Sequence, residues 1–293
     1  MNLTSRPRVS DYFSLIKFSH TIFALPFAFI GFLLGAKEKN FQFEWKLPVL
    51  VILCMVFARS AAMAFNRWAD RDIDAKNIRT NMREIPSGKI SSKSAFVFVI
   101  LNCILFIACT FFINSICFFF SPVALLVVLG YSYTKRFTSL SHLVLGLGLS
   151  LAPIGSYLAV TGNFNLLPLL FSIAVLTWVS GFDIIYALQD IEFDRENNLN
   201  SIPSKLGIKG SMRASELLHL FASAVLFLAS FYGKFSWIYL CGWGIFTILL
   251  IYQHTLVKAN DLSKVNVAFF TTNGIASVMF AIFVALEILC TPF

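Results

Sequence analysis

Two pairs of aspartates share one spacing along the chain, Asp70-x-x-x-Asp74 and Asp190-x-x-x-Asp194. On a helix, residues four apart lie one turn apart on the same face, so each pattern predicts two neighbouring carboxylates. Their negative charges repel each other unless a cation lies between them. Mg²⁺ fits this role, because it binds one or two carboxylates and leaves positions for the phosphate oxygens of a substrate. The spacing therefore predicts a metal-assisted site, with Asn66, one turn before Asp70, as a further candidate ligand.

Polar residues extend both acidic faces into apolar segments. Tyr186 and Asp183 lie four and seven residues before Asp190, and Arg59 lies eleven residues before Asp70. Ionisable side chains inside a membrane-spanning helix are costly and usually functional. Asp183 is therefore a functional-site candidate, and Arg59 requires an anionic partner, either Asp183 or the carboxylate of a bound substrate. A single acidic pair would be interpreted as solvated loop charges, but two pairs, both extended by polar residues, indicate a site.

Cations accompany the acidic residues in the same polar segments. Guanidinium groups bind phosphate oxygens through two parallel hydrogen bonds, and lysine adds a point charge. Acidic faces together with these cations are typical of a Mg²⁺-diphosphate site; the alternative is that the cations only fix membrane topology. The candidate diphosphate ligands are Arg79, Arg83, Lys135, Arg136 and Lys205.

The composition shows which elements must position these residues. Of the 293 residues, 58% are hydrophobic and 13% are charged, against about 25% charged in soluble domains. The mean hydropathy of +0.78 comes from apolar runs that are long enough to cross the ~30 Å hydrocarbon core of a bilayer. The net charge of +8 does not indicate nucleic-acid binding, because the basic residues flank apolar runs. The six cysteines have no C-x-x-C spacing and are predicted to be packing residues.

The apolar runs predict an all-α membrane protein that forms a single domain, residues 1–293, with nine spans. With the N-terminus in the cytoplasm, the inner segments hold 18 of the 23 basic residues and the outer segments hold four, as the positive-inside rule requires. The N-terminus has no signal-peptide cleavage pattern and is expected to be retained. The two longest inner loops, 68–93 and 191–213, follow spans two and six and carry the acidic pairs. The predicted spans are 15–36, 47–67, 94–113, 116–134, 141–160, 167–190, 216–233, 236–257 and 266–290.

In these motifs the chain resembles the UbiA superfamily of intramembrane aromatic prenyltransferases, over residues 20 to 207. The start of the first span, His20-Thr21-x-Phe23-Ala24-Leu25-Pro26-Phe27, looks most like bacterial members that act on 4-hydroxybenzoate; His20 itself is interpreted as a packing or helix-end residue. The matching motifs are Arg59-Ser60-Ala61-Ala62, Asn66-x-x-x-Asp70-x-x-x-Asp74, Arg79-Thr80, Arg83-x-x-Pro86-x-Gly88, Tyr131-x-Tyr133-x-Lys135-Arg136, Tyr186-x-x-x-Asp190-x-x-x-Asp194 and Ser201-Ile202-Pro203.

The resemblance implies nine helices around a central cavity, capped on the cytoplasmic side, in the inner membrane of a bacterium. It implies transfer of a polyprenyl group from a polyprenyl diphosphate to a small aromatic acid, with Mg²⁺ as cofactor. The implied metal ligands are Asp70, Asp74, Asp190, Asp194 and Asn66. Tyr186 joins the diphosphate ligands, and Arg59, Asn66 and Tyr131 contact the acceptor. Arg67 departs from the family pattern, because many members carry a second acidic residue after the asparagine.

Two alternatives remain open from the sequence. The acceptor of some similar bacterial members is a dihydroxynaphthoate of menaquinone synthesis instead of a 4-hydroxybenzoate-like acid of ubiquinone synthesis. A secondary transporter with buried charges is the alternative from another functional class. Transporters usually place polar or broken segments at the midplane of both halves, whereas the acidic residues here gather at the inner ends of spans. This distribution favours an enzyme.

Overall fold

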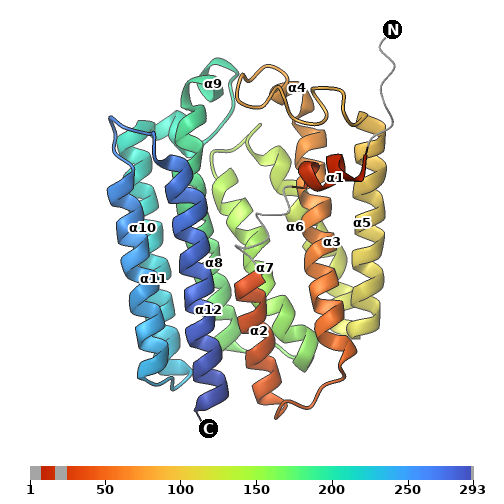
Figure 1. Cartoon of the computed structure of the whole chain (residues 1–293), viewed down its shortest axis with the longest axis vertical. Coiled ribbons are helices and arrows are strands. Elements are labelled where there is room, and N and C mark those ends of the chain that lie inside the picture. The colour runs from red at the N-terminus through yellow and green to blue at the C-terminus, as the bar shows by residue number, and fades with distance from the viewer. Residues whose placement is uncertain (1–7, 17–24, 292–293) are drawn as a thin grey trace. The chain divides into compact units, whose positions relative to one another are not determined.

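The computed structural model describes residues 8–16 and 25–291. Every regular element within these residues is helical (Figure 1). The chain divides into two compact units. The first lies within residues 1–21 and 49–133, and the second within residues 22–48 and 134–293.

Most of the helices belong to the second unit. In the first unit the helices are α1 (Val9–Leu15), α3 (Lys46–Ala69), α4 (Arg71–Asp74), α5 (Ser92–Ile113) and α6 (Ser115–Thr134). In the second unit they are α2 (Leu25–Glu38), α7 (Ser141–Thr161), α8 (Leu166–Ala187), the 3₁₀ turn η2 (Leu188–Asp190), α9 (Ile191–Glu196), α10 (Ile202–Tyr232), α11 (Trp237–Leu256), the π-helical segment η3 (Val267–Thr272) and α12 (Asn273–Cys290).

Eight helical segments in the described part of the chain are long and apolar enough to cross a membrane. They correspond to the second to ninth predicted spans. The first predicted span, 15–36, is not among them: α2 has 14 residues, which span only about 20 Å, and residues 17–24 lie outside the described residues, as does His20. An all-helical integral membrane protein is thus confirmed, and the ninth span stays a prediction.

The largest boundary difference concerns α10, which begins at Ile202 although the predicted span begins at 216. Ser201 caps this helix, because its hydroxyl accepts a hydrogen bond from the Ser204 backbone N–H at 3.1 Å. The helix kinks at Gly207, whose φ of 67° favours glycine. Much of the predicted loop 191–213 is therefore helical.

Small residues let α8 pack closely against α7 and α10. A Cβ atom on Gly146 of α7 would lie 2.3 Å from the Leu176 carbonyl oxygen of α8. A Cβ atom on Gly181 of α8 would lie 2.4 Å from the His219 ring of α10. The Ser215 hydroxyl donates to the Gly181 carbonyl oxygen at 2.7 Å. Such close contacts commonly drive association of membrane helices, and here they fix α8, whose C-terminal end leads into the turn and short helix that carry the second acidic pair.

Candidate functional site

The first acidic pair lies at a break between two helices. α3 ends at Ala69 and α4 begins at Arg71, while Asp70 adopts φ −94° and ψ 5°. The prediction of a continuing helix is therefore wrong at this position. One helical hydrogen bond crosses the break, from the Asp74 backbone N–H to the Asp70 carbonyl oxygen at 2.7 Å. It keeps the two aspartates one turn apart, and both residues are buried.

The second acidic pair shows the same backbone break. α8 passes into the 3₁₀ turn η2, and α9 follows Asp190, whose φ of −108° and ψ of 10° resemble those of Asp70. The continuing helix is wrong here too. Asp194 lies within α9, and its backbone carbonyl accepts the Leu199 N–H at 2.8 Å. In each pair the first aspartate therefore lies at a junction between helical segments and the second lies in the short helix that follows.

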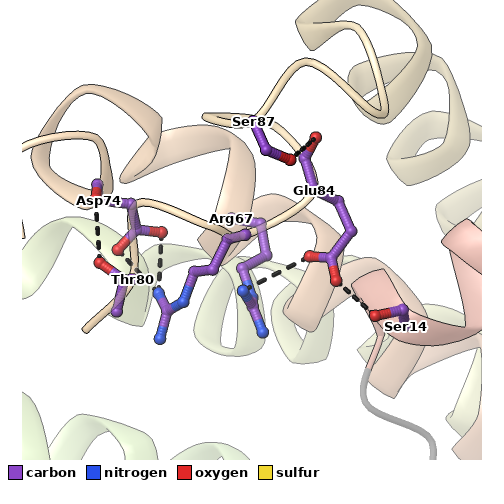
Figure 2. A network of polar contacts seen from close by, with 7 residues as sticks. Ser14, Arg67, Asp74, Thr80, Glu84 and Ser87 are labelled. Atoms are coloured by element: carbon purple, nitrogen blue, oxygen red, sulfur yellow. Dashed lines mark hydrogen bonds and ion pairs between the residues drawn. The ribbon is translucent and has the colours of Figure 1, made fainter. Parts of the chain in front are cut away.

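Arg83 holds the second carboxylate of the first pair. Its Nη1 donates to Asp74 Oδ1 at 2.7 Å and to Oδ2 at 2.8 Å. The Thr80 hydroxyl donates to the Asp74 carbonyl oxygen at 3.1 Å, which folds the following loop back over α4 (Figure 2). The Asn66 side-chain amide donates to Asp70 Oδ2 at 3.3 Å. The structure thus brings together three residues of the predicted site, Asn66, Asp70 and Asp74, with the predicted cation Arg83.

Arg67, the departure from the family pattern, has a defined partner. Figure 2 shows its guanidinium directed at Glu84, with Arg67 Nη1 3.6 Å from Glu84 Oε2. The other carboxylate oxygen of Glu84 accepts a hydrogen bond from the Ser14 hydroxyl of α1 at 2.5 Å. Arg67 and Glu84 are both buried. Sequence reasoning missed Glu84 and Ser14, although a buried arginine at position 67 required an acidic partner.

The other predicted cations differ in exposure. Arg79, Arg136 and Lys205 are exposed, and Lys135 is half-buried. The Lys135 carbonyl oxygen accepts the Asn200 N–H at 2.7 Å, and Lys135 lies within electrostatic range of Asp194. The structure thus brings Lys135, one of the predicted cations, to the second acidic pair.

The predicted acceptor ligands Arg59 and Tyr131 belong to the first unit. Arg59 Nε is buried and has no hydrogen-bond partner among the described residues, and Tyr131 lies within electrostatic range of the guanidinium. Tyr186, in the second unit, packs its ring against Phe269 with a centroid distance of 4.2 Å. The pairing of Arg59 with Asp183 stays a prediction.

The structure gives Asp183 a partner that sequence reasoning missed. His142 Nδ1 of α7 lies 2.7 Å from Asp183 Oδ2 of α8. The two residues are 41 positions apart, and no local pattern connects them. The sequence did contain one signal for this contact, a histidine just inside the apolar run 141–160. A buried imidazole needs a hydrogen-bond partner, because burying a polar group without one is costly.

The donor chemistry of the acidic pairs suits Mg²⁺. Within the described ranges no three His, Cys, Asp or Glu side chains gather into a metal site. Each motif offers two hard carboxylate ligands, which is the usual protein contribution to a Mg²⁺ whose remaining ligands are water and phosphate oxygens. Asp74 keeps this capacity beside Arg83, because each carboxylate oxygen carries a second lone pair.

Comparison with known proteins assigns the family. The UbiA prenyltransferase family model matches residues 24–280. The chain is 31% identical over 245 residues to a 4-hydroxybenzoate octaprenyltransferase of Aliivibrio fischeri, covering 81% of this chain and 82% of the relative. It is 28% identical over 234 residues to the Francisella tularensis subsp. mediasiatica protein of that name, covering 80% and 82%.

Solved structures agree with this assignment. A UbiA homologue from Aeropyrum pernix K1 has a TM-score of 0.79 at 30% identity, covering 92% of this chain and 97% of that one. A UbiA homologue from Archaeoglobus fulgidus bound to GPP and Mg²⁺ has a TM-score of 0.73 at 20% identity, covering 96% and 100%; this second likeness shows the fold. The chain belongs to the UbiA prenyltransferase family and is a membrane-embedded prenyltransferase.

Proposed function

We propose that the protein transfers a polyprenyl group from a polyprenyl diphosphate to a 4-hydroxybenzoate-like aromatic acid, with Mg²⁺ as cofactor. The observation that carries the proposal is the shared geometry of the two acidic pairs, each with its first aspartate at a helix break and a cation beside its second. The names of the curated relatives and the GPP and Mg²⁺ in the Archaeoglobus homologue support it.

The acidic pairs and their cations form the diphosphate end of the proposed site. Asp70, Asp74, Asp190 and Asp194, with Asn66, would hold Mg²⁺, which neutralises the diphosphate and makes it a better leaving group. Fixed cations aimed at the departing oxygens stabilise the negative charge that develops as the carbon–oxygen bond breaks. These cations are Arg79, Arg83, Lys135, Arg136 and Lys205, with Tyr186 as a further ligand.

Charged residues deeper in the helices form the acceptor end. Arg59, whose buried Nε lacks a hydrogen bond to the described residues, would pair with the carboxylate of the acceptor, and Tyr131 and Asn66 would line its ring. The diphosphate leaves with the bonding electron pair, and a ring carbon of the acceptor forms the new carbon–carbon bond. Over the whole substitution the acceptor releases one proton, which passes to Asp183. Apolar walls exclude water, which would otherwise capture the allylic cation.

The topology belongs to the same proposal. Residues 1–293 would form one domain with nine spans, the N-terminus in the cytoplasm, and caps at 68–93 and 191–213 over a cavity that opens to the cytoplasm. This arrangement suits the substrates, because the prenyl tail is as apolar as the bilayer while the diphosphate and the small acid require the aqueous face. The membrane would be the inner membrane of a bacterium.

The test is prenyl transfer by the detergent-purified protein from geranyl diphosphate, with and without Mg²⁺. 4-Hydroxybenzoate and a dihydroxynaphthoate are supplied in parallel, so that the preferred acid assigns the quinone pathway. We expect Mg²⁺-dependent product, and loss of turnover by at least about 100-fold in Asp70→Asn and Asp190→Asn, because each removes a charged metal ligand.

Two neighbouring acidic residues provide matched controls. Asp72 lies two positions after Asp70 with its side chain 81% exposed, and Glu192 lies two positions after Asp190 and is also exposed. Asp72→Asn and Glu192→Gln should keep turnover within a few-fold of the parent. Full activity in Asp70→Asn, or equal losses in target and control variants, would contradict the metal-binding role.

A further inference from the structure

His142 and Asp183 form a largely buried pair between α7 and α8. His142 is buried, with 5% of its side chain exposed, whereas the Asp183 side chain keeps 21% exposure. α8 is the most enclosed of the candidate spans, and Asp183 keeps this exposure although its neighbours Phe182 and Ile184 are buried. The carboxylate is therefore the member of the pair that a substrate can reach, and the imidazole lies behind it.

The second nitrogen of His142 determines which ring atom carries the proton. Nε2 is buried and has no hydrogen-bond partner among the described residues. A proton on Nε2 would be an unsatisfied donor, and the Nδ1 lone pair would then face the carboxylate oxygen 2.7 Å away. A neutral imidazole with its proton on Nδ1 avoids both penalties. With this tautomer His142 Nδ1–H donates to Asp183 Oδ2, and the carboxylate oxygen accepts.

The surrounding helices fix this pair. The close contact at Gly146 holds α7 against α8 one turn after His142, and the Ser180 hydroxyl donates to the His142 carbonyl oxygen at 3.1 Å. Besides Asp183, Asp194 of α9 lies within electrostatic range of His142, and Asp190 and Lys135 lie within electrostatic range of Asp194.

The position of Asp183 along α8 matches that of an acceptor site. Asp183 precedes Asp190 by seven residues, which corresponds to about 10 Å along a helix. In a prenyl diphosphate the reacting carbon is bonded directly to the diphosphate, so an attacking acceptor must lie on the side of that carbon away from the metal-binding end. Asp183 lies on that side of the second acidic pair.

We propose that His142 is a positioning residue for Asp183 in removing a proton from the acceptor, an inference that rests on the proposed function. In the balanced step the bond from the prenyl carbon to the diphosphate oxygen breaks, and the diphosphate keeps the electron pair. The acceptor ring carbon bonds to the prenyl carbon while the phenolic O–H loses its proton to Asp183 Oδ1. The substituted ring carbon then loses its hydrogen as a proton, the former phenolic oxygen takes up a proton, and aromaticity returns, so that the net proton released is the one on Asp183. The His142 Nδ1–H keeps Asp183 Oδ2 in place throughout.

The test compares four variants in the full-length protein: Asp183→Asn, His142→Ala, His142→Asn and, as a matched control, His219→Asn. His219 is also buried, but its Nε2 lies 3.1 Å from a backbone carbonyl oxygen, that of Trp178. kcat and the KM of geranyl diphosphate are measured between pH 7 and pH 9.5. Loss of a general base costs on the order of 100-fold or more, and misplacing it costs roughly 10- to 100-fold.

We expect His142→Ala to lose kcat at pH 7 by roughly 10- to 100-fold with an unchanged KM for the prenyl donor, and His142→Asn to recover most of it through its amide N–H. The loss should shrink towards pH 9.5, because a phenol with a pKa of about 10 increasingly ionises without a base. A parental kcat in His142→Ala, or a pH-independent loss equal to that of His219→Asn, would overturn the proposal. Absence of transfer in the parent protein would instead overturn the proposed function.

Discussion

Asp70 and Asp190 adopt nearly the same backbone conformation, with φ near −100° and ψ close to zero. This sparsely populated region is common at active-site residues. At both positions a helix stops, one residue adopts this conformation and a short helix resumes. The repeat of this geometry in two motifs 120 positions apart argues that the two aspartates have the same role.

Arg83 supplies a prediction at the residue scale. Arg83→Gln leaves the Asp74 carboxylate, only 6% exposed, without its cation, and we expect a loss of about 1–3 kcal/mol in unfolding free energy. Because Mg²⁺ binds carboxylates, added Mg²⁺ should raise the Tm of this variant more than that of the parent. Thermal unfolding in detergent with and without Mg²⁺ measures both effects.

Arg79 provides the control for this prediction. Its side chain is exposed, four residues before Arg83, so Arg79→Gln removes the same charge from the same loop. We expect its Tm to stay close to that of the parent. Equal Tm values for the two variants would show that the contact between Arg83 and Asp74 does not stabilise the loop.

Some residues of the site share a helical face that their spacing in the sequence predicts, whereas others meet only because distant helices pack together. The aspartates and Arg59 follow helical spacing, so the sequence predicts their shared faces. The contacts of Asp183 with His142 and of Glu84 with Ser14 join residues 41 and 70 positions apart. Such contacts depend on which helices pack together, and neither hydropathy nor spacing contains that information. Asn66, Asp70 and Asp74 were predicted as one group, whereas the buried partners around them were not.

At the scale of elements, hydropathy predicted where the apolar spans lie but not where every helix begins and ends. The charges Lys205, Lys209 and Arg213 placed the start of a span near 216, yet α10 begins at Ile202 because Ser201 caps it. The backbone kinks at Gly207, but the turns on both sides of the kink are helical although they carry these charges, because the three exposed side chains reach solvent. Charge therefore ends the apolar span and not the helical conformation. The breaks at Asp70 and Asp190 carry no glycine or proline signal, and the sequence therefore did not indicate them.

Gly146 gives a prediction at this scale. A Cβ at Gly146 would lie 2.3 Å from the Leu176 carbonyl oxygen and 2.4 Å from Ser180 Oγ, so Gly146→Ala must push α7 away from α8. We expect a loss of roughly 1–3 kcal/mol and reduced prenyl transfer, because His142 lies on the adjacent turn of α7. Thermal unfolding and activity of the purified variant measure the two effects.

Gly155 of α7 is the matched control. No atom lies within 4 Å of a Cβ built at this position, and alanine favours a helix by about 1 kcal/mol over glycine. Gly155→Ala should therefore keep or raise the Tm. If both alanine variants were equally stable, close packing at Gly146 would not be what holds α7 against α8.

At the scale of the whole molecule, composition alone was enough to predict a polytopic helical protein. A chain with 58% hydrophobic residues must hide its backbone polar groups from lipid, and helices satisfy those groups within each segment. Composition predicts the class of protein, whereas the number of spans depends on the length of each apolar run. The structure shows eight candidates among the described residues, and the predicted ninth depends on the segment that precedes and includes α2.

Topology is the last prediction. The 18-to-4 division of basic residues places Val9, Lys76 and Lys209 in the cytoplasm and Lys39 and Lys234 outside. All five side chains are exposed, so each can become a single cysteine in a variant that lacks the six native cysteines. A membrane-impermeant maleimide applied to intact bacterial spheroplasts should label the cysteines at positions 39 and 234 at once, and the other three only after permeabilisation.

Labelling of positions 9 and 39 from the same side would mean that no span lies between them, and the inverse pattern would reverse the orientation. The expected pattern would give nine spans and place both acidic pairs at the cytoplasmic face, where a water-soluble aromatic acid can enter.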